Sequence, residues 1–254
     1  MVALASAGLI GLIAAALDAI PAGAADAISS AERSKIESVV HDYLMQHPEV
    51  VLDALKELDR KEQEAAAVQA KDVIRKEHQT LTRDGAAGVI GNPKGDVSVV
   101  EFFDYNCGYC RLVADEVKAL VKSDPNVRVV LHEWPIRGPG SVGAAKVSLA
   151  ASKQKNFAAF HFALLATDGT VDEARALAVA KEQGLDMAQL ARDMKAQNAA
   201  PILSKTEDLT HRLGLSGTPG FIIGDTLIGG ATSLDNLKKT VAEARAACKK
   251  DPIC

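Results

Sequence analysis

Apolar residues recur at helical spacing soon after the first 28 residues of the chain. Ser29 and Glu32 have the S-x-x-E form of a capping box, which marks the start of a helix. Pro48 ends that helix and can serve as the first residue of the next one. Between them, one helical face carries apolar residues: Ile36, Val39, Val40, Tyr43 and Leu44. The pattern predicts two consecutive helices with a break at Pro48.

The second predicted helix is long and loses its apolar face after a few turns. Residues 49–84 contain neither Gly nor Pro, and at 1.5 Å per residue they would extend about 54 Å as one helix. Their first turns carry Val51, Leu52, Leu55 and Leu58. The Gly-containing stretch 84–96 then has the composition of a linker. We therefore expect a helical oligomerisation arm over residues 25–83, followed by a linker over 84–96.

This arm is expected to self-associate. An arm separated from the rest of the chain by a linker has little domain surface on which to bury its apolar face, and burying one such side chain is worth about 1.5–3 kcal/mol. Residues 30–80 are thus predicted to make the protein a homo-oligomer. The alternative is that the arm folds back on its own domain.

The rest of the chain alternates strand and helix patterns. The predicted elements, in order, are a buried strand over 97–103, a helix from Cys107 to about Lys122, a strand over 126–136, a broken helical block over about 140–215, a hairpin over 221–230 and a helix ending near Cys248. This order predicts the α/β class, as a thioredoxin fold with a helical insertion at about 140–215. The predicted domain covers residues 97–254.

The first 24 residues differ from everything after them. They are apolar, rich in Ala and end in Ala22-Gly23-Ala24, the small-x-small pattern that precedes a signal-peptidase cut. A permanent membrane anchor is the alternative, but Asp18, Pro21 and the shortness of the apolar stretch argue against it. We expect a removed signal peptide over 1–24, hence a periplasmic protein in which disulfides persist.

Composition excludes one class of partner. The formal net charge is −4 and only 4% of the residues are aromatic. A chain of this kind offers neither the basic surface nor the stacking platforms that nucleic acids need. No nucleic-acid partner is expected.

Cys107 and Cys110 form a C-x-x-C motif directly after the first predicted strand. A structural metal site would require a second ligand pair at suitable spacing, and a disulfide closing so short a loop would constrain little. A redox pair fits the placement, because a helix N-terminus stabilises a thiolate at the first cysteine and presents the second one turn inward. We expect redox chemistry with no metal and no cofactor.

Cys248 and Cys254 form a second pair near the end of the chain. Asp251-Pro252 between them is a turn signal, so the two ends can meet. A structural disulfide is predicted in an exported protein. Free thiols, an intermolecular link and a copper site are the alternatives.

Three stretches of this sequence together resemble a known family. "VVEFFDYNCGYC", "HEWPI" and "SGTPGFIIGDTLIGG" resemble the DsbA-like periplasmic thiol–disulfide oxidoreductases over residues 97–247. The segment "YLMQHPEVVLDALKEL" is similar to the arm of the suppressor of copper sensitivity group, ScsC. The second resemblance implies oligomerisation through the arm, with a trimer favoured, and disulfide isomerase activity.

The resemblance also implies roles for individual residues. Cys107 matches the exposed nucleophile and Cys110 the buried resolving thiol, while Gly108 and Tyr109 fill the dipeptide that tunes the redox potential and borders the substrate. The most oxidising relatives have a His in that dipeptide. Its absence here argues against a very low pKa for Cys107.

Three further positions match the family outside the motif. Thr218 and Pro219 match the cis-proline loop that faces the active site, where the backbone of Thr218 would pair with an extended substrate. Glu101 matches a buried acid that would take a proton from Cys110. The expected activity is exported thiol–disulfide exchange on cysteine-containing proteins, with a membrane redox partner that recycles the pair. Isomerase or reductase work is favoured, and a dithiol oxidase of DsbA type or a copper(I)-binding protein using the same cysteines are the alternatives.

Overall fold

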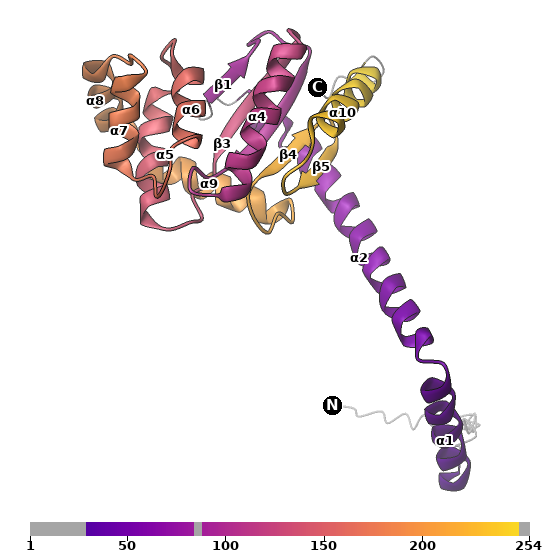
Figure 1. Cartoon of the computed structure of the whole chain (residues 1–254). Helices are drawn as coiled ribbons and strands as arrows, with labels where there is room; N and C mark the ends of the chain where they lie inside the picture. Colours follow the sequence, from indigo (N-terminus) through magenta and orange to yellow (C-terminus); the bar gives the residue numbers. More distant parts are fainter. Residues whose placement is uncertain (1–28, 84–87, 249–254) are drawn as a thin grey trace, which may run out of the picture. The chain divides into compact units, whose positions relative to one another are not determined.

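The computed structural model describes residues 29–83 and 88–248, and the predicted signal peptide over 1–24 lies outside these residues. The chain divides into two compact units, residues 1–58 and residues 59–254. Figure 1 traces both, and each is described by itself. Among the described residues, no helix combines the length and apolarity needed to cross a bilayer.

The first unit consists of helix α1 (Ser30–Gln46) and the start of helix α2 (Glu49–Lys76). The Ser29 side chain accepts a hydrogen bond from the backbone N–H of Glu32, and the Glu32 carboxylate accepts one from the backbone N–H of Ser29. The predicted capping box is therefore confirmed. The helical pattern is interrupted at His47 and Pro48, as predicted.

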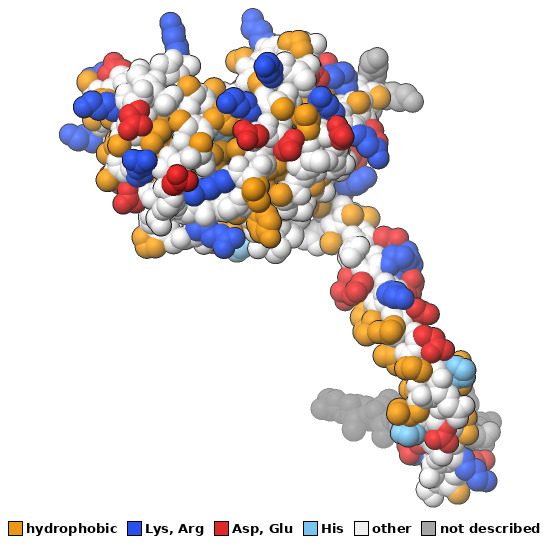
Figure 2. Space-filling view, in the orientation of Figure 1, with side chains coloured by type: hydrophobic (Ala, Val, Ile, Leu, Met, Phe, Trp, Pro, Cys, Tyr) orange, Lys and Arg blue, Asp and Glu red, His pale blue; other side chains and the backbone are white. Residues whose placement is uncertain are grey.

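Apolar side chains of the first unit are exposed to solvent, and Figure 2 shows them in orange along the arm. We call this set the arm stripe: Ile36, Val39, Val40, Tyr43, Met45, Val50, Val51, Leu52, Leu55 and Leu58. Its members are between 38% and 70% exposed. No residue of α1 is buried.

The second unit is built on a five-stranded mixed sheet in the order β1-β3-β2-β4-β5. Strands β2 and β3 are parallel, whereas the pairs β1–β3, β2–β4 and β4–β5 are antiparallel. The strands are β1 (Gly88–Gly91), β2 (Val97–Phe103), β3 (Val127–Glu133), β4 (Gly220–Ile223) and β5 (Thr226–Gly229). The predicted strands and hairpin are confirmed, with β1 in addition.

Alternation along the strands sends side chains to two hydrophobic clusters. In β2, Val99 and Phe103 enter the larger cluster, whereas Val100 and Phe102 enter the smaller one. Because both faces are covered, all seven residues of β2 are buried, and the strand has no polar alternation in its sequence.

Helices cover both faces of the sheet (Figure 1). Helices α4 and α10 and the insertion contribute to the larger cluster, and the end of α2 together with α3 and α9 contributes to the smaller one. The helices are α3 (His78–Thr82), α4 (Gly108–Ser123), α5 (Pro139–Ala151), α6 (Phe157–Leu165), α7 (Glu173–Glu182), α8 (Met187–Ala196), α9 (Ala199–Arg212) and α10 (Leu234–Cys248). The predicted insertion at about 140–215 corresponds to α5 through α9.

The boundary between arm and domain differs from the expected one. Residues from Asp59 onward belong to the second unit, and Ile74 and Leu81 are each 1% exposed within the smaller cluster. The predicted linker over 84–96 contains β1, whose Ile90 is buried against the sheet. The apolar periodicity of a helix does not show whether its last turns pack on a sheet. The Gly residues on either side of Ile90 are not typical of a strand, so the sequence pattern did not predict β1.

Candidate active site

Cys107 is the last residue of the turn that connects β2 to α4. It is the N-cap residue of the helix, in extended backbone conformation, and its backbone N–H donates to the carbonyl of Asp104 at 3.0 Å. Gly108, Tyr109 and Cys110 form the first turn. The strand–motif–helix order places the first thiol at the positive end of the helix dipole.

The Cys107 side chain is buried, with 0% of the residue exposed, contrary to the exposed position that the family resemblance implied. Its thiol donates to the carbonyl oxygen of Thr218, with Sγ and O separated by 3.1 Å. The loop at Thr218, far away in sequence, therefore covers the sulfur. The position of Cys107 next to a helix N-terminus could not by itself predict that the loop at Thr218 covers its sulfur.

Hydrogen bonds to the ionised sulfur lower the pKa of Cys107 to about 4. The Cys110 thiol contributes most, followed by the Thr218 side chain and the backbone N–H groups of Cys110 and Tyr109, against the opposing effect of burial. The absence of a His in the dipeptide argued against so low a value. The hydrogen-bond donors that take the place of the missing His come from the first turn of α4 and from the loop at Thr218.

Cys110 has the opposite environment. Burial raises the pKa of its thiol, and the hydrogen bond to Cys107 and the charge of Glu101 raise it further. The two sulfurs of one motif thus differ in proton affinity, because their surroundings favour the thiolate at Cys107 and the protonated thiol at Cys110.

Glu101 is the buried acid that the sequence predicted. It is 1% exposed in the middle of β2, and burial raises its pKa to about 8. Its Oε1 atom has no hydrogen-bond partner among the described residues. An acid poised near neutral pH, whose charge acts on Cys110, can exchange a proton with that thiol.

The Thr218–Pro219 peptide bond is cis, as predicted. Both residues are buried directly before β4, and the Pro219 carbonyl accepts from the backbone N–H of Gly230. The Thr218 hydroxyl has no hydrogen-bond partner among the described residues. It is therefore available as a donor when Cys107 is ionised.

Tyr109 and Leu112 give the start of α4 an apolar outer surface. They are 62% and 72% exposed and stand three residues apart, so they lie on one face of the helix. The apolar pattern of this helix did not distinguish Leu112 from the buried Val113 and Val117. This surface lies next to the motif and suits an unfolded polypeptide.

Residues outside the predicted set of site residues hold the turn before Cys107. The Asp104 carboxylate accepts from the backbone N–H groups of Asn106 and Arg137 and from the Ser141 hydroxyl, at 2.7 to 2.8 Å. Arg111 donates from Nε to the carbonyl of Tyr105 at 2.9 Å and from Nη2 to that of Gly169 at 2.8 Å. These contacts join the active-site turn to the insertion.

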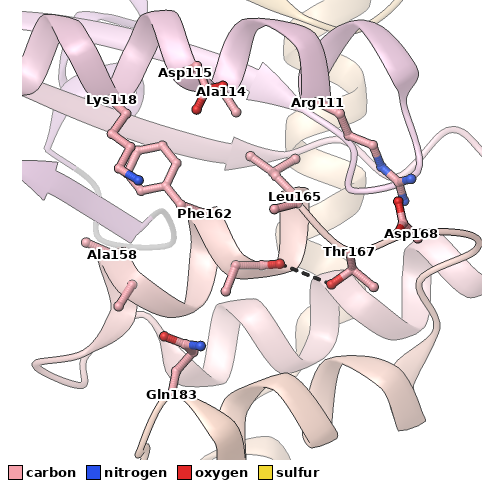
Figure 3. Close-up of a pocket in the computed structure, with 13 residues that line it drawn as sticks. Arg111, Ala114, Asp115, Lys118, Ala158, Phe162, Leu165, Thr167, Asp168 and Gln183 are labelled. Carbon is pink, nitrogen blue, oxygen red and sulfur yellow. Dashed lines mark hydrogen bonds between the residues drawn. The ribbon is translucent and has the colours of Figure 1, made fainter.

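A cavity of about 780 Å³ lies beside this site, between α4 and α6 (Figure 3). Its lining includes Arg111, Asp115, Lys118, Phe162 and Asp168, but neither active-site cysteine. The Lys118 amine is 5.7 Å from the centre of the Phe162 ring. This cavity is therefore adjacent to the two cysteines of the motif and does not contain them.

Cys248 is disulfide-bonded, whereas Cys254 lies outside the described residues, so the pairing of these two stays a prediction. Within residues 29–83 and 88–248, no cluster of three or more His, Cys, Asp or Glu side chains could hold a metal ion.

Two family models match this chain. The DSBA-like thioredoxin domain matches residues 98–242, and the Copper resistance protein ScsC N-terminal domain matches residues 32–65. The first match contains both active-site cysteines, Glu101 and the cis proline. The second contains all ten residues of the arm stripe.

Solved structures of similar proteins extend the match. A thioredoxin-like oxidoreductase from Silicibacter pomeroyi is 46% identical, with a TM-score of 0.62, covering 66% of this chain and 97% of that one. A linker-deletion mutant of Proteus mirabilis ScsC is 27% identical, with a TM-score of 0.65 and coverage of 87% and 98%. Salmonella enterica BcfH is 27% identical, with a TM-score of 0.71 and coverage of 85% and 96%.

The curated relatives are longer proteins. The Na(+)/H(+) antiporter NhaA 1 of Salinispora arenicola is 28% identical over 166 residues, which is 65% of this chain and 26% of the antiporter. This chain thus spans about a quarter of the length of the curated relatives that it matches. The match to residues 98–242, the C-x-x-C at a helix start and the facing cis proline together show that the chain belongs to the family of DSBA-like thioredoxin domains, with the arm of the ScsC type.

Proposed function

We propose that this protein is an exported thiol–disulfide oxidoreductase that acts on cysteine-containing proteins in the periplasm. The observation that carries the proposal is the opposite environment of the two sulfurs, a thiolate at Cys107 and a protonated thiol at Cys110 above the buried Glu101. The apolar surface of Tyr109 and Leu112 supports unfolded polypeptides as substrates.

The first step is attack on a substrate disulfide. The Cys107 thiolate forms a bond to one substrate sulfur while the substrate S–S bond breaks, and the departing substrate sulfur leaves as a thiolate. For this attack the loop at Thr218 must uncover the Cys107 sulfur. The backbone of Thr218 would pair with the extended substrate, and Pro219, having no N–H, would not compete for those hydrogen bonds.

The mixed disulfide then has two outcomes. A second substrate thiolate attacks the substrate sulfur that is bonded to Cys107, which rearranges the substrate disulfides and regenerates the Cys107 thiolate without net electron transfer. Alternatively, the Cys110 thiol gives its proton to the Glu101 carboxylate and attacks Cys107, which releases reduced substrate and leaves a Cys107–Cys110 disulfide. A membrane redox partner would then return two electrons to the pair.

We favour isomerase or reductase activity because the arm supports an oligomer. The arm stripe exposes ten apolar side chains, and none of the residues 29–58 that the structure describes in this unit is buried. Association of several arms, a trimer by analogy with the ScsC group, would direct several Cys107 sites at one substrate. It would also hinder docking to a partner built for monomers.

A dithiol oxidase is the second candidate, and the low pKa of Cys107 favours it. A thiolate that is stabilised only in the reduced protein makes the disulfide form a stronger oxidant. Copper(I) binding is a third candidate, since two neighbouring thiols offer soft ligands once the pair is reduced. Copper(I) binding would be lost in the oxidised protein, because both sulfurs are then held in the disulfide.

Thiol trapping in cells separates the two directions of electron flow. A mostly reduced Cys107–Cys110 pair supports the isomerase or reductase, and a mostly oxidised pair supports the oxidase. Failure of the purified protein to exchange disulfides in either direction would overturn the proposed function.

Light scattering tests the oligomer on the full mature chain. The double variant Leu52→Asp/Leu55→Asp should dissociate it and lower isomerase activity. Gln63→Asp, a charge added at an exposed polar position of the same helix, serves as the control and should leave the mass unchanged. A wild-type protein that runs as a monomer would exclude the oligomer.

A further inference from the structure

The Asn106 side chain joins the turn before Cys107 to a distant part of the helical insertion. Its Oδ1 atom accepts from the backbone N–H of Val171 at 2.7 Å, and its Nδ2 atom donates to the backbone carbonyl of Val171 at 2.8 Å. Nδ2 also donates to the Ser141 hydroxyl at 2.9 Å. One amide group thus satisfies both backbone groups of a residue outside any helix or strand, in the way that a paired strand residue would.

The backbone of the turn is fixed as well as the Asn106 side chain. The backbone N–H of Asn106 donates to the Asp104 carboxylate at 2.7 Å, and the Ser141 hydroxyl donates to the same carboxylate at 2.7 Å. The backbone N–H of Cys107 donates to the carbonyl of Asp104 at 3.0 Å, and the Cys107 carbonyl accepts from the backbone N–H of Arg111 at 3.1 Å. Both peptide groups that flank the Cys107 side chain are therefore held by hydrogen bonds.

A second connection reaches the same loop of the insertion from the other side of Cys107. Nη2 of Arg111 donates to the carbonyl of Gly169 at 2.8 Å, while Nε of Arg111 donates to the carbonyl of Tyr105 at 2.9 Å. Val171, in the loop with Gly169, is 0% exposed and packs in the larger cluster. Residues before and after Cys107 are therefore bonded to one loop, and that loop is itself anchored in the core.

We propose that Asn106 is a positioning residue of the redox centre, which fixes the turn before Cys107 to residues 169–171 of the insertion and so holds the Cys107 sulfur at the N-terminus of α4. The sulfur depends on this placement, because its hydrogen-bonding partners include the backbone N–H groups of Tyr109 and Cys110 and the facing loop at Thr218. A planar peptide joins Asn106 to Cys107, so a shift of one residue moves the other. The role rests on the proposed thiol–disulfide chemistry but not on its net direction.

Asn92 provides a matched control for Asn106. Its Nδ2 atom donates to the carbonyl of Pro125 at 2.9 Å, and its Oδ1 atom accepts from the backbone N–H of Lys94 at 2.9 Å. It lies beside the start of β3, whereas Cys107 follows the end of β2. Because β2 and β3 are parallel, the two asparagines are at opposite ends of the sheet. Asn92→Leu therefore removes the same kinds of hydrogen bond far from the Cys107 sulfur.

Ultraviolet titration of the Cys107 thiolate in the reduced full mature chain compares the two variants. Asn106→Leu keeps the branching of the side chain but removes its three hydrogen bonds, so the titration midpoint should rise by about one pH unit, a tenfold change in proton affinity. Asn92→Leu should leave the midpoint in place, even though urea unfolding shows a loss of stability. Equal shifts in both variants, or an unchanged midpoint in Asn106→Leu, would overturn the proposal.

Amide hydrogen exchange of the wild-type protein tests the same contact if Asn106→Leu does not fold. The backbone N–H of Val171 donates to Oδ1 of Asn106, so it should exchange at least about tenfold more slowly than the exposed backbone N–H of Thr170 beside it. Exchange of the Val171 N–H as fast as that of Thr170 would contradict the proposal. Neither measurement requires a substrate. A protein that passes both but exchanges no disulfides would contradict only the proposed function.

Discussion

Helices α1 and α4 carry similar apolar spacing in the sequence but have opposite environments in the structure. Val113, Val117 and Leu120 of α4 are at most 2% exposed in the larger cluster. The arm stripe, in contrast, is at least 38% exposed throughout. Helical periodicity therefore identifies a face that must be covered, while the cover itself is supplied by another part of the molecule or by another molecule.

Helix α2 contains exposed apolar side chains at one end and buried ones at the other. Its first turns contribute Leu52 and Leu55 to the arm stripe, whereas Val73 and Ile74 near its end are buried against the sheet. The proposed division of function follows this difference: we assign the redox chemistry to the second unit and propose the arm stripe as the surface for association. Substitutions in the two regions should therefore have effects of different kinds.

The largest expected effect is at the redox centre. Cys107→Ser removes the sulfur that we propose attacks the substrate, and turnover of a scrambled disulfide substrate should fall on the order of a thousandfold or more. Cys110→Ser keeps the first step and loses the resolving thiol, so mixed disulfides should accumulate on non-reducing gels. Full turnover by Cys107→Ser would remove the assignment of the nucleophile.

The next effect compares the two ends of α2 directly. Ile74→Ala should lower the free energy of unfolding of the second unit by about 3 kcal/mol, because it leaves a cavity in a packed cluster. Leu55→Ala should change it by less than about 0.5 kcal/mol, because that side chain is 52% exposed. Urea unfolding at one protein concentration, followed by the fluorescence of Trp134, measures both. Equal losses would show that the arm stripe is packed on the second unit.

The third prediction concerns Glu101 and pH. Its pKa is raised from 4.5 to about 8 in the folded protein, so the folded state retains a proton that the unfolded state releases between these values. The contribution of protonated Glu101 to stability is therefore fully present below pH 4.5. The free energy of unfolding declines as pH rises toward 8 and is lower by about 3 kcal/mol at pH 7 than below pH 4.5. Glu101→Gln should remove this decline and stabilise the protein at neutral pH.

Urea unfolding of wild type and Glu101→Gln at several pH values measures that difference. The Gln variant should also resolve mixed disulfides more slowly, since Cys110 loses its proton acceptor. A wild-type stability that is flat from pH 5 to 8 would contradict the buried acid, whatever the activity of the variant.

The smallest expected effect compares surface ion pairs in the two units. Arg245 of α10 donates to Asp96 through two hydrogen bonds of 2.8 Å and to Asp124 at 2.9 Å. Arg245→Ala should therefore cost about 1 kcal/mol in the free energy of unfolding. In the first unit, Lys56 forms an exposed pair with Asp53, and Lys56→Ala should have no measurable effect. A cost for Lys56→Ala equal to that for Arg245→Ala would show that Lys56 has a role beyond this pair.

Several features followed from local sequence signals. The capping box at Ser29, the break at Pro48, strand β2 and the start of α4 at the C-x-x-C depend on periodicity, caps and proline geometry within a few residues. The cysteine pair and the buried Glu101 could be identified for the same reason, because a redox motif and an apolar strand stand next to each other in the chain. Helix propensity, strand alternation and helix-dipole chemistry operate at this short range.

Only the tertiary structure decided the rest. The sheet recruits β1 from the predicted linker, where a side chain at Gly88 would clash with the Phe157 ring. The carbonyl of Thr218 covers Cys107, and the Tyr105 hydroxyl contacts Ser148 and His161, which brings together residues from three separate segments. Contacts between distant segments depend on how packed elements bring them together, and neither periodicity nor spacing records this. The sequence alone therefore identified the groups that we propose react, and the folded structure determined their exposure, their proton affinities and their partners.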